Sequence, residues 1–397
     1  MTKPLSGIRV LDLTNVLAGP FCCHQLVHFG AEVIKVEAPL RGDLARQLGA
    51  DAELNKKGMG VSFLAQNAGK KSVTLNLKSD AGKRLLKRLV ASADVLVENF
   101  RPGVMARLGL DYDVLRETKP ELIYCAISGF GQDGPWVDRP AYDQIIQGVS
   151  GVMSITGDAD SAPLRVGYPL ADTVGGMTAA FAITAALNAR PRGTFIDISM
   201  LESVIATMGW VVSNHLIADQ TPAPRGNENW TSAPSGAFET AKGVLNIAAN
   251  KDEQWVLLTD HLGLAPLRDH PDYQTREDRK RNRFALKTAL EEVLTTKPAQ
   301  HWSDTLNSIG VPAGVVMRVP EVLDAPQIAD RGFLAEFDTV PGVGRSIQTV
   351  TTGAKLDGDA PSVDQPPPQL GQDNVAIWGE LGLSPEEIAD MEKKGVI

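Results

Sequence analysis

Short apolar runs alternate with amphipathic segments along the first 130 residues of the chain. The apolar runs predict strands at residues 8–13, 31–37, 71–77, 94–98 and 122–127. Residues 20–28 and 79–91 have helical character, and Ser79 with Asp80 is a typical helix start. Strand, helix and strand follow one another within residues 8–37, which is the order of a βαβ unit. The pattern therefore predicts an α/β fold with a parallel sheet.

The pattern changes in the second half of the chain. A helix rich in Ala, Gly and Met is predicted at 172–188, a strand at 194–198 and a long apolar helix at 201–219. The polar segment 220–229 contains two prolines and a glycine and predicts a linker. Beyond it, a smaller α+β unit is predicted, with a strand at 243–249 and helices near 251–262, 276–294 and 299–309.

The composition is that of a globular protein without a basic face. Of the 397 residues, 43% are hydrophobic and 22% charged, and a net charge of −9 argues against a nucleic-acid partner. No uninterrupted run reaches the roughly 18 apolar residues that span a bilayer, and the N-terminal segment has no apolar signal core. The cysteines, Cys22, Cys23 and Cys125, are odd in number, which fits a reducing compartment. We therefore expect a cytoplasmic protein without membrane contact.

Asp172 is the candidate catalytic residue. It stands between an apolar run and the predicted helix that follows, and Thr173 is its only polar side-chain neighbour. A carboxylate in this place is either a helix N-cap or a nucleophile. The local spacing alone favours the cap.

Other motifs argue against several kinds of site. Residues 129–134 match the GxGxxG pattern, but they run into Pro135 rather than a helix whose N-terminus would hold a pyrophosphate. The sequence contains no P-loop, no HExxH or paired CxxC metal motif, and no GxSxG elbow. We therefore expect no metal and no permanently bound cofactor.

Cationic side chains gather where predicted strands end. Ligands of α/β proteins bind beyond the carboxyl ends of the strands, so a phosphorylated adenosine would meet cations there. Asn99 and Phe100 follow a buried strand, and they have groups that can hydrogen-bond an adenine edge or stack on a base. The cations are Arg41, Arg46, Lys70, Lys71, Lys78, Arg101, Arg107 and Arg139.

Several ordered segments resemble the family III CoA-transferases. This is the formyl-CoA transferase and carnitine CoA-transferase group, which also contains the α-methylacyl-CoA racemases. The resemblance runs from about residue 6 to the C-terminus, and Asp172 lies at the expected place. The segments are VLDLTNVLAGP (10–20), GAEVIKVE (30–37), RGD (41–43), NAGKKS (67–72), VENFRPG (97–103), SGFGQDGP (128–135) and LGQ (370–372).

The resemblance implies a Rossmann-like large domain and a small α+β domain, with two subunits threaded through each other as an interlocked homodimer. The large domain would span residues 1–219 and be completed by 340–397. Residues 220–229 would form a linker, 230–325 the small domain and 326–339 a return linker.

The resemblance also implies site residues. Asp172 matches the catalytic aspartate of the family. Leu17 stands where formyl-CoA transferase has glutamine, which argues against a formyl or oxalate role. Tyr142 stands where the racemases have histidine, and a phenol with a pKa of about 10 is a poor α-proton base. The implied CoA contacts are Val16, Arg41, Leu75, Lys78, Asn99, Phe100, Arg107, Arg139 and Met200.

The implied reaction moves CoA from an acyl-CoA to a carboxylic acid through aspartyl anhydride and aspartyl-CoA thioester intermediates. The overall pattern is most similar to enzymes of succinyl-CoA and other short dicarboxylates. Leu17, Tyr142 and three arginines that could bind a distal carboxylate, Arg46, Arg165 and Arg225, are the substrate candidates. An α-methylacyl-CoA racemase and a non-catalytic CoA-binding module are the alternatives.

Overall fold

The computed structural model describes residues 3–397 and divides into two compact units. The first unit comprises the chain through Val152, Arg165–Asp219 and Pro326–Ile397. The second comprises Met153–Leu164 and Gln220–Ala325.

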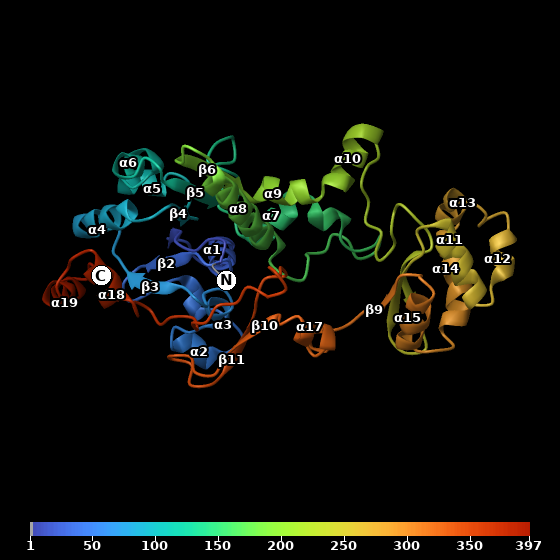
Figure 1. Ribbon diagram of the computed structural model, residues 1–397. Coiled ribbons are helices and arrows are strands. Elements are labelled where there is room, and N and C mark those ends of the chain that lie inside the picture. The colour runs from blue at the N-terminus through green and yellow to red at the C-terminus, as the bar shows by residue number, and fades with distance from the viewer. Residues whose placement is uncertain (1–2) are drawn as a thin grey trace. The chain divides into compact units, whose positions relative to one another are not determined.

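A six-stranded sheet forms the centre of the first unit (Figure 1). Every pair of neighbouring strands is parallel, as the sequence predicts. The chain fills one side of the sheet first and then returns to β1 to fill the other, so the order reverses between β1 and β4. Such a reversal leaves a crevice at the carboxyl ends of the strands. The strands in spatial order are β3 (Lys71–Thr74), β2 (Glu32–Glu37), β1 (Arg9–Asp12), β4 (Val95–Glu98), β5 (Ile123–Ser128) and β6 (Thr194–Ser199).

Helices from both ends of the chain complete the core of this unit. Leu89 and Leu115 are buried in one apolar cluster with Trp378 and Ile388 of the C-terminal helices, which Figure 1 shows in red beside α4. The helices up to residue 149 are α1 (Ala18–His28), the 3-10 helix η1 (Leu44–Gln47), α2 (Ala52–Lys56), α3 (Val61–Leu64), α4 (Asp80–Ala91), α5 (Val104–Leu108), α6 (Tyr112–Thr118) and α7 (Asp143–Val149). The later elements are α8 (Leu170–Asn188), α9 (Met200–Thr207), α10 (Gly209–Ala218), α17 (Pro326–Asp330), β10 (Leu334–Phe337), β11 (Ile347–Val350), α18 (Asn374–Glu380) and α19 (Pro385–Lys393). Residues 152–155 form a second 3-10 helix, η2 (Val152–Ile155), where the two units meet in the sequence.

Helix α8 is long and apolar enough to cross a membrane by length and composition alone. Asp172 and three threonines interrupt its apolar run, so the sequence pattern does not reveal it. In the structure α8 packs against α1, β5 and β6 within the first unit. Its glycines serve this packing, because a Cβ on Gly176 would clash with the carbonyl oxygen of Ala18.

The second unit is a three-stranded antiparallel sheet with helices. Its strands are β7 (Ser235–Glu239), β8 (Val244–Ala248) and β9 (Ala313–Val315), in that spatial order. Trp255, Leu290 and Trp302 from three helices form its core with strand residues such as Leu245. The helices are α11 (Asp252–His261), α12 (Ala265–Asp269), α13 (Arg276–Arg281), α14 (Arg283–Leu294), α15 (Ala299–Ser308) and α16 (Val319–Leu323).

Two expected segments differ in the structure. Residues 153–164, expected in the large domain, group with the second unit, where the carbonyl oxygen of Gly157 accepts from the Gly226 N–H at 2.7 Å. Residues 326–339, expected as a return linker, group with the first unit because β10 pairs with β11. The helices predicted at 201–219 and 276–294 are each two shorter helices, which break at Met208 and Asn282.

Candidate active site

A cavity of about 340 Å³ opens at the carboxyl end of the parallel sheet. The segments after β1, β4 and β5 form its walls, together with the first turn of α8 and the start of α9. This is where the strand order reverses and where ligands of α/β proteins bind. The predicted site residues that line it are Val16, Leu17, Asn99, Phe100, Arg139, Tyr142, Asp172 and Met200.

Asp172 is the only carboxylate among the residues that line the cavity. It lies inside the first turn of α8, whose N-cap is Pro169, so the expectation that Asp172 caps this helix is wrong. Burial, and then the nearby charge of Asp143, raise the pKa of Asp172 to about 7. A helix start favours the ionised form of a carboxylate, but desolvation outweighs that effect here.

Asp143 is the neighbour that the sequence analysis missed. Its Oδ1 atom accepts from the N–H of Ala171 at 2.8 Å and from the N–H of Asp172 at 3.4 Å. Asp143 therefore binds the free amides at the start of α8 from another helix. Gln147 Nε2 donates to Asp143 Oδ2 at 2.8 Å, which fixes the carboxylate. The available signal was a carboxylate directly after Tyr142, at the first position of α7.

The turn after β1 forms one wall of the cavity. Asn99 binds both backbone groups of Asn15: its Oδ1 accepts from the Asn15 N–H and its Nδ2 donates to the Asn15 carbonyl, each at 2.8 Å. Each amide atom of Asn99 therefore already has one partner, and its second N–H and second lone pair are left for a ligand. Phe100 remains at the wall, where its ring can contact a ligand.

Only some of the cationic residues line the cavity. Arg101 and Arg139 line the cavity, and the Arg139 guanidinium lies 4.5 Å from the centre of the Trp136 ring. Lys78 and Arg107 are exposed but do not line it. Arg41 lines a separate hollow of about 760 Å³ with Lys56 and Lys57.

Four expected site residues are engaged or placed elsewhere. Leu75 is 2% exposed in the core, so its side chain offers no surface to CoA. Arg46 is 1% exposed and its Nε lies 2.7 Å from Glu37, which removes it as a free cation for a substrate. Arg165 faces Asp143 at 3.5 Å, and Arg225 of the second unit lies 3.3 Å from the centre of the Trp230 ring.

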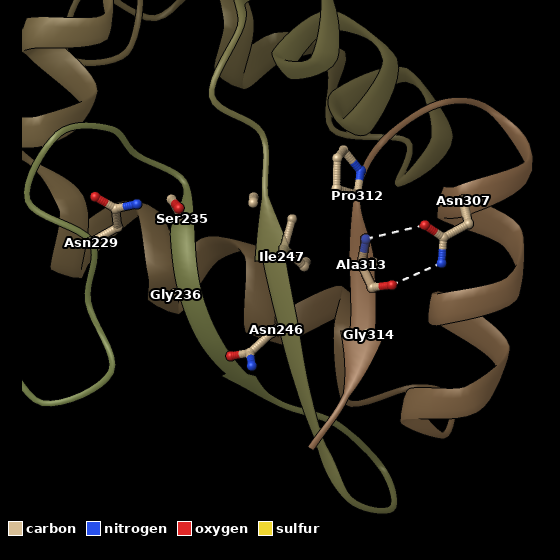
Figure 2. A pocket seen from close by; sticks show the side chains of 10 residues that line it. Asn229, Ser235, Gly236, Asn246, Ile247, Asn307, Pro312, Ala313 and Gly314 are labelled. Atoms are coloured by element: carbon tan, nitrogen blue, oxygen red, sulfur yellow. Dashed lines mark hydrogen bonds between the residues drawn. The ribbon is translucent and has the colours of Figure 1, made fainter. Parts of the chain in front are cut away.

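The second unit contains its own hollow, of about 430 Å³, on the sheet β7–β8–β9 (Figure 2). Asn229, Asn246 and Asn307 lie around it, and Asn307 is bound to the backbone of Ala313. No charged residue lines this hollow, so it offers no cation to the phosphates of CoA or to a carboxylate. Within residues 3–397, no cluster of three or more His, Cys, Asp and Glu side chains could hold a metal ion.

Comparison with known proteins defines the class of this protein, a CoA-transferase that uses CoA thioesters as co-substrates. The chain belongs to CoA-transferase family III, whose family model matches residues 5–374. An acetyl-CoA:oxalate CoA-transferase from Acetobacter aceti is 37% identical, over 95% of this chain and 96% of the relative. A succinyl-CoA:glutarate CoA-transferase from Mus musculus is also 37% identical, over 96% of this chain and 86% of the relative. A crystal structure of a CAIB/BAIF family protein from Brucella suis superposes with a TM-score of 0.82 at 33% identity, and covers 96% of this chain and 100% of that chain.

Proposed function

We propose that the cavity of Asp172 is the site of CoA transfer and that Asp172 is its nucleophile. The carboxylate attacks the thioester carbonyl of the donor, the C–S bond breaks, and a mixed anhydride and CoA thiolate form. The thiolate attacks the aspartyl carbonyl and releases the donor acid, which leaves an aspartyl-CoA thioester. The acceptor carboxylate then displaces the thiolate from this thioester to form a second anhydride. Attack of the thiolate on the acceptor acyl group gives the new acyl-CoA and restores Asp172.

The observation that carries this proposal is a single half-buried carboxylate in the wall of a cavity with two arginines. A carboxylate with a raised pKa is more basic and therefore a better nucleophile once ionised. Acylation also removes its charge, so the desolvation that penalises the free carboxylate does not penalise the anhydride or the thioester. The phosphates of CoA and the carboxylates of the acids would be attracted by Arg101 and Arg139.

Trapping the acyl-enzyme tests this chemistry. Incubation of the protein with acyl-CoA in the absence of an acceptor acid should produce an activated Asp172 carbonyl. Hydroxylamine should convert it to a hydroxamate, which peptide mass spectrometry would locate at Asp172. A protein that only binds CoA would give no modified peptide, and modification of another carboxylate would overturn the assignment.

We propose that donor and acceptor are short dicarboxylates, with succinyl-CoA as the donor. The relatives from Acetobacter aceti and Mus musculus are named for oxalate and for glutarate, both dicarboxylic acids, and each is 37% identical to this chain. Identity therefore does not separate the two acids, although Leu17 in the cavity wall argues against oxalate. Arg101 and Arg139 are the cations of the cavity that could bind a distal carboxylate, in place of Arg46.

A substrate panel tests the choice of acid. With succinyl-CoA as donor, we expect kcat/KM for glutarate to exceed that for a monocarboxylic acid of similar length by about a hundredfold. The reason is that the monocarboxylic acid would leave an arginine of the cavity without a carboxylate partner. Chromatographic measurement of the acyl-CoA products would show this ratio. Equal rates with both acids, or turnover with carnitine substrates alone, would contradict the proposal.

We propose that the protein is an interlocked homodimer. Helix α10 has no buried residue in the single chain, and its Trp210, Leu216 and Ile217 are 71%, 75% and 84% exposed. An apolar helix of this kind is typical of a subunit interface. Light scattering should give twice the chain mass, and a monomer at micromolar concentration would contradict the proposal.

A further inference from the structure

We propose that Asp43 is a positioning residue for CoA transfer: its carboxylate holds Val16 in a left-handed backbone conformation and so shapes the wall of the Asp172 cavity. The inference rests on the proposed function, because it takes that cavity as the active site. Asp43 itself does not line the cavity.

Val16 has an unusual backbone conformation. Its φ angle is +69°, which a β-branched residue rarely adopts because the side chain crowds the backbone. Such a conformation persists only when surrounding contacts enforce it, and it is concentrated at functional sites. Val16 and its neighbours Leu17 and Ala18 all line the cavity.

The contact that enforces this conformation comes from Asp43. Asp43 Oδ1 accepts from the Val16 N–H at 2.9 Å and from the Ala45 N–H at 2.8 Å. Its other oxygen, Oδ2, lies 2.9 Å from Lys35 Nζ, and both side chains are fully buried. The carboxylate is therefore held from two sides and cannot rotate away from Val16 without leaving a buried charge unpaired.

Two buried lysines hold the same segment at two further points. Lys35 Nζ donates to the carbonyl of Thr14 at 2.8 Å, and Lys70 Nζ donates to the carbonyl of Pro20 at 2.9 Å. Asp12 connects the lysines, since its Oδ2 lies 2.8 Å from Lys70 and its Oδ1 4.0 Å from Lys35. Although burial raises the pKa of Asp12, Lys35 and Lys70 lower it to about 2, so the Asp12 carboxylate stays charged at neutral pH.

The consequence is a rigid segment, residues 14–20, which runs from the end of β1 into the first turn of α1. It places the cavity-lining backbone at the start of α1, which packs against the helix of Asp172. A shift of about 1 Å in such a wall can reduce turnover about a hundredfold, because the reacting groups must be aligned. The inference therefore predicts a loss of kcat from a residue that touches no substrate.

A double-mutant cycle between Asp43 and Val16 tests the inference. We expect Asp43→Ala to lower kcat by about 10- to 100-fold, because Val16 loses the acceptor that holds its strained conformation. Adding Val16→Gly to this variant should recover kcat by about tenfold, since glycine adopts a positive φ without strain. The melting temperature should not recover, because Lys35 keeps only the carboxylate of Asp12, 4.0 Å away, as an ion-pair partner. If Val16→Gly has the same effect in both backgrounds, or if Asp43→Ala has wild-type kcat, the inference is wrong.

The conservative variant separates positioning from stability. Asp43→Asn keeps an oxygen that can accept from Val16 but loses the ion pair, so its melting temperature should fall while its kcat stays at least about tenfold above that of Asp43→Ala. Should Asp43→Ala fail to fold, a loss of a hundredfold or more in folded Asp43→Asn would overturn the inference. Asp94→Ala is the matched control: Asp94 pairs with Arg192 at 3.1 Å before β4, at the opposite end of the sheet, and its removal should lower only the melting temperature.

Asp172→Ala, measured beside this cycle, distinguishes failure of the inference from failure of the proposed function. If Asp172→Ala retains transfer, both the proposed function and this inference are wrong. If Asp172→Ala is inactive while the effects at Asp43 and Val16 are additive, the proposed function stands and only the inference fails.

Discussion

Replacing Asp172 with alanine should lower kcat for CoA transfer by about a thousandfold or more, without lowering the melting temperature. The loss follows because no other carboxylate lines the cavity to form the anhydride. The melting temperature should hold because burial penalises this carboxylate, so its removal relieves a cost of folding. Rates would be measured by chromatography of the acyl-CoA products, and melting temperatures by calorimetry.

Asp172→Asn and Asp172→Glu complete this experiment. Asparagine keeps the volume but is a poor nucleophile, so it should be as inactive as alanine. Glutamate keeps the carboxylate but moves it by about one C–C bond, which should leave measurable but much reduced turnover, by about a hundredfold. Substantial transfer by a folded Asp172→Ala protein would refute the assignment of the nucleophile.

Five strands of the parallel sheet, β1 to β5, could be predicted because they are buried on both faces. Such strands appear in the sequence as continuous apolar runs, and the amphipathic segments between them leave few other topologies. The helices predicted at 201–219 and 276–294 show the limit of this approach. Apolar residues continue across Met208, and Asn282 lies within the polar and charged run 276–283, so neither pattern reveals that the backbone breaks there.

The site was only partly predictable for a related reason. Motif positions near strand ends, such as Val16, Phe100 and Arg139, do meet at the cavity because the topology brings those ends together. Whether a polar side chain is free depends on partners that are distant in the sequence. Arg46 is bound by Glu37 and Asn99 by Asn15, and neither pairing follows from spacing.

Asp143 shows the same limit for electrostatics. It lies 29 residues before Asp172 in the sequence, yet its carboxylate accepts from the Asp172 N–H. A helix start by itself lowers the pKa of a nearby carboxylate. In the folded protein, a second carboxylate accepts from the amides of that helix, and burial desolvates Asp172, so its pKa rises instead. The direction of the pKa shift is therefore a property of the tertiary structure.

The pH dependence of CoA transfer should follow from this arrangement. Asp172 reacts as a carboxylate, so kcat/KM should fall as the pH drops below about 7, the pKa to which burial and Asp143 raise it. Asp143→Asn removes the second of these causes and should move the acidic limb to lower pH. The limb should not reach the ordinary value of 3.8, because desolvation, the larger cause, remains. A pH profile of kcat/KM for both proteins would measure the shift.

Arg165→Gln is the matched control, because it removes a positive charge where Asp143→Asn removes a negative one. Arg165 faces Asp143 at 3.5 Å and partly offsets its charge, so its removal should leave the acidic limb in place or move it to higher pH.

The pH dependence of stability gives an independent check. The folded protein holds a proton on Asp172 up to about pH 7, whereas the unfolded chain releases it near 3.8, so the unfolded state binds fewer protons between these values. The contribution of Asp172 therefore makes the free energy of unfolding fall as the pH rises from about 4 to about 7, by at most about 1.4 kcal/mol per pH unit, and this slope should be absent in Asp172→Asn. A limb that stays near pH 7 in Asp143→Asn, together with equal slopes in the wild type and Asp172→Asn, would show that Asp172 does not titrate in this range.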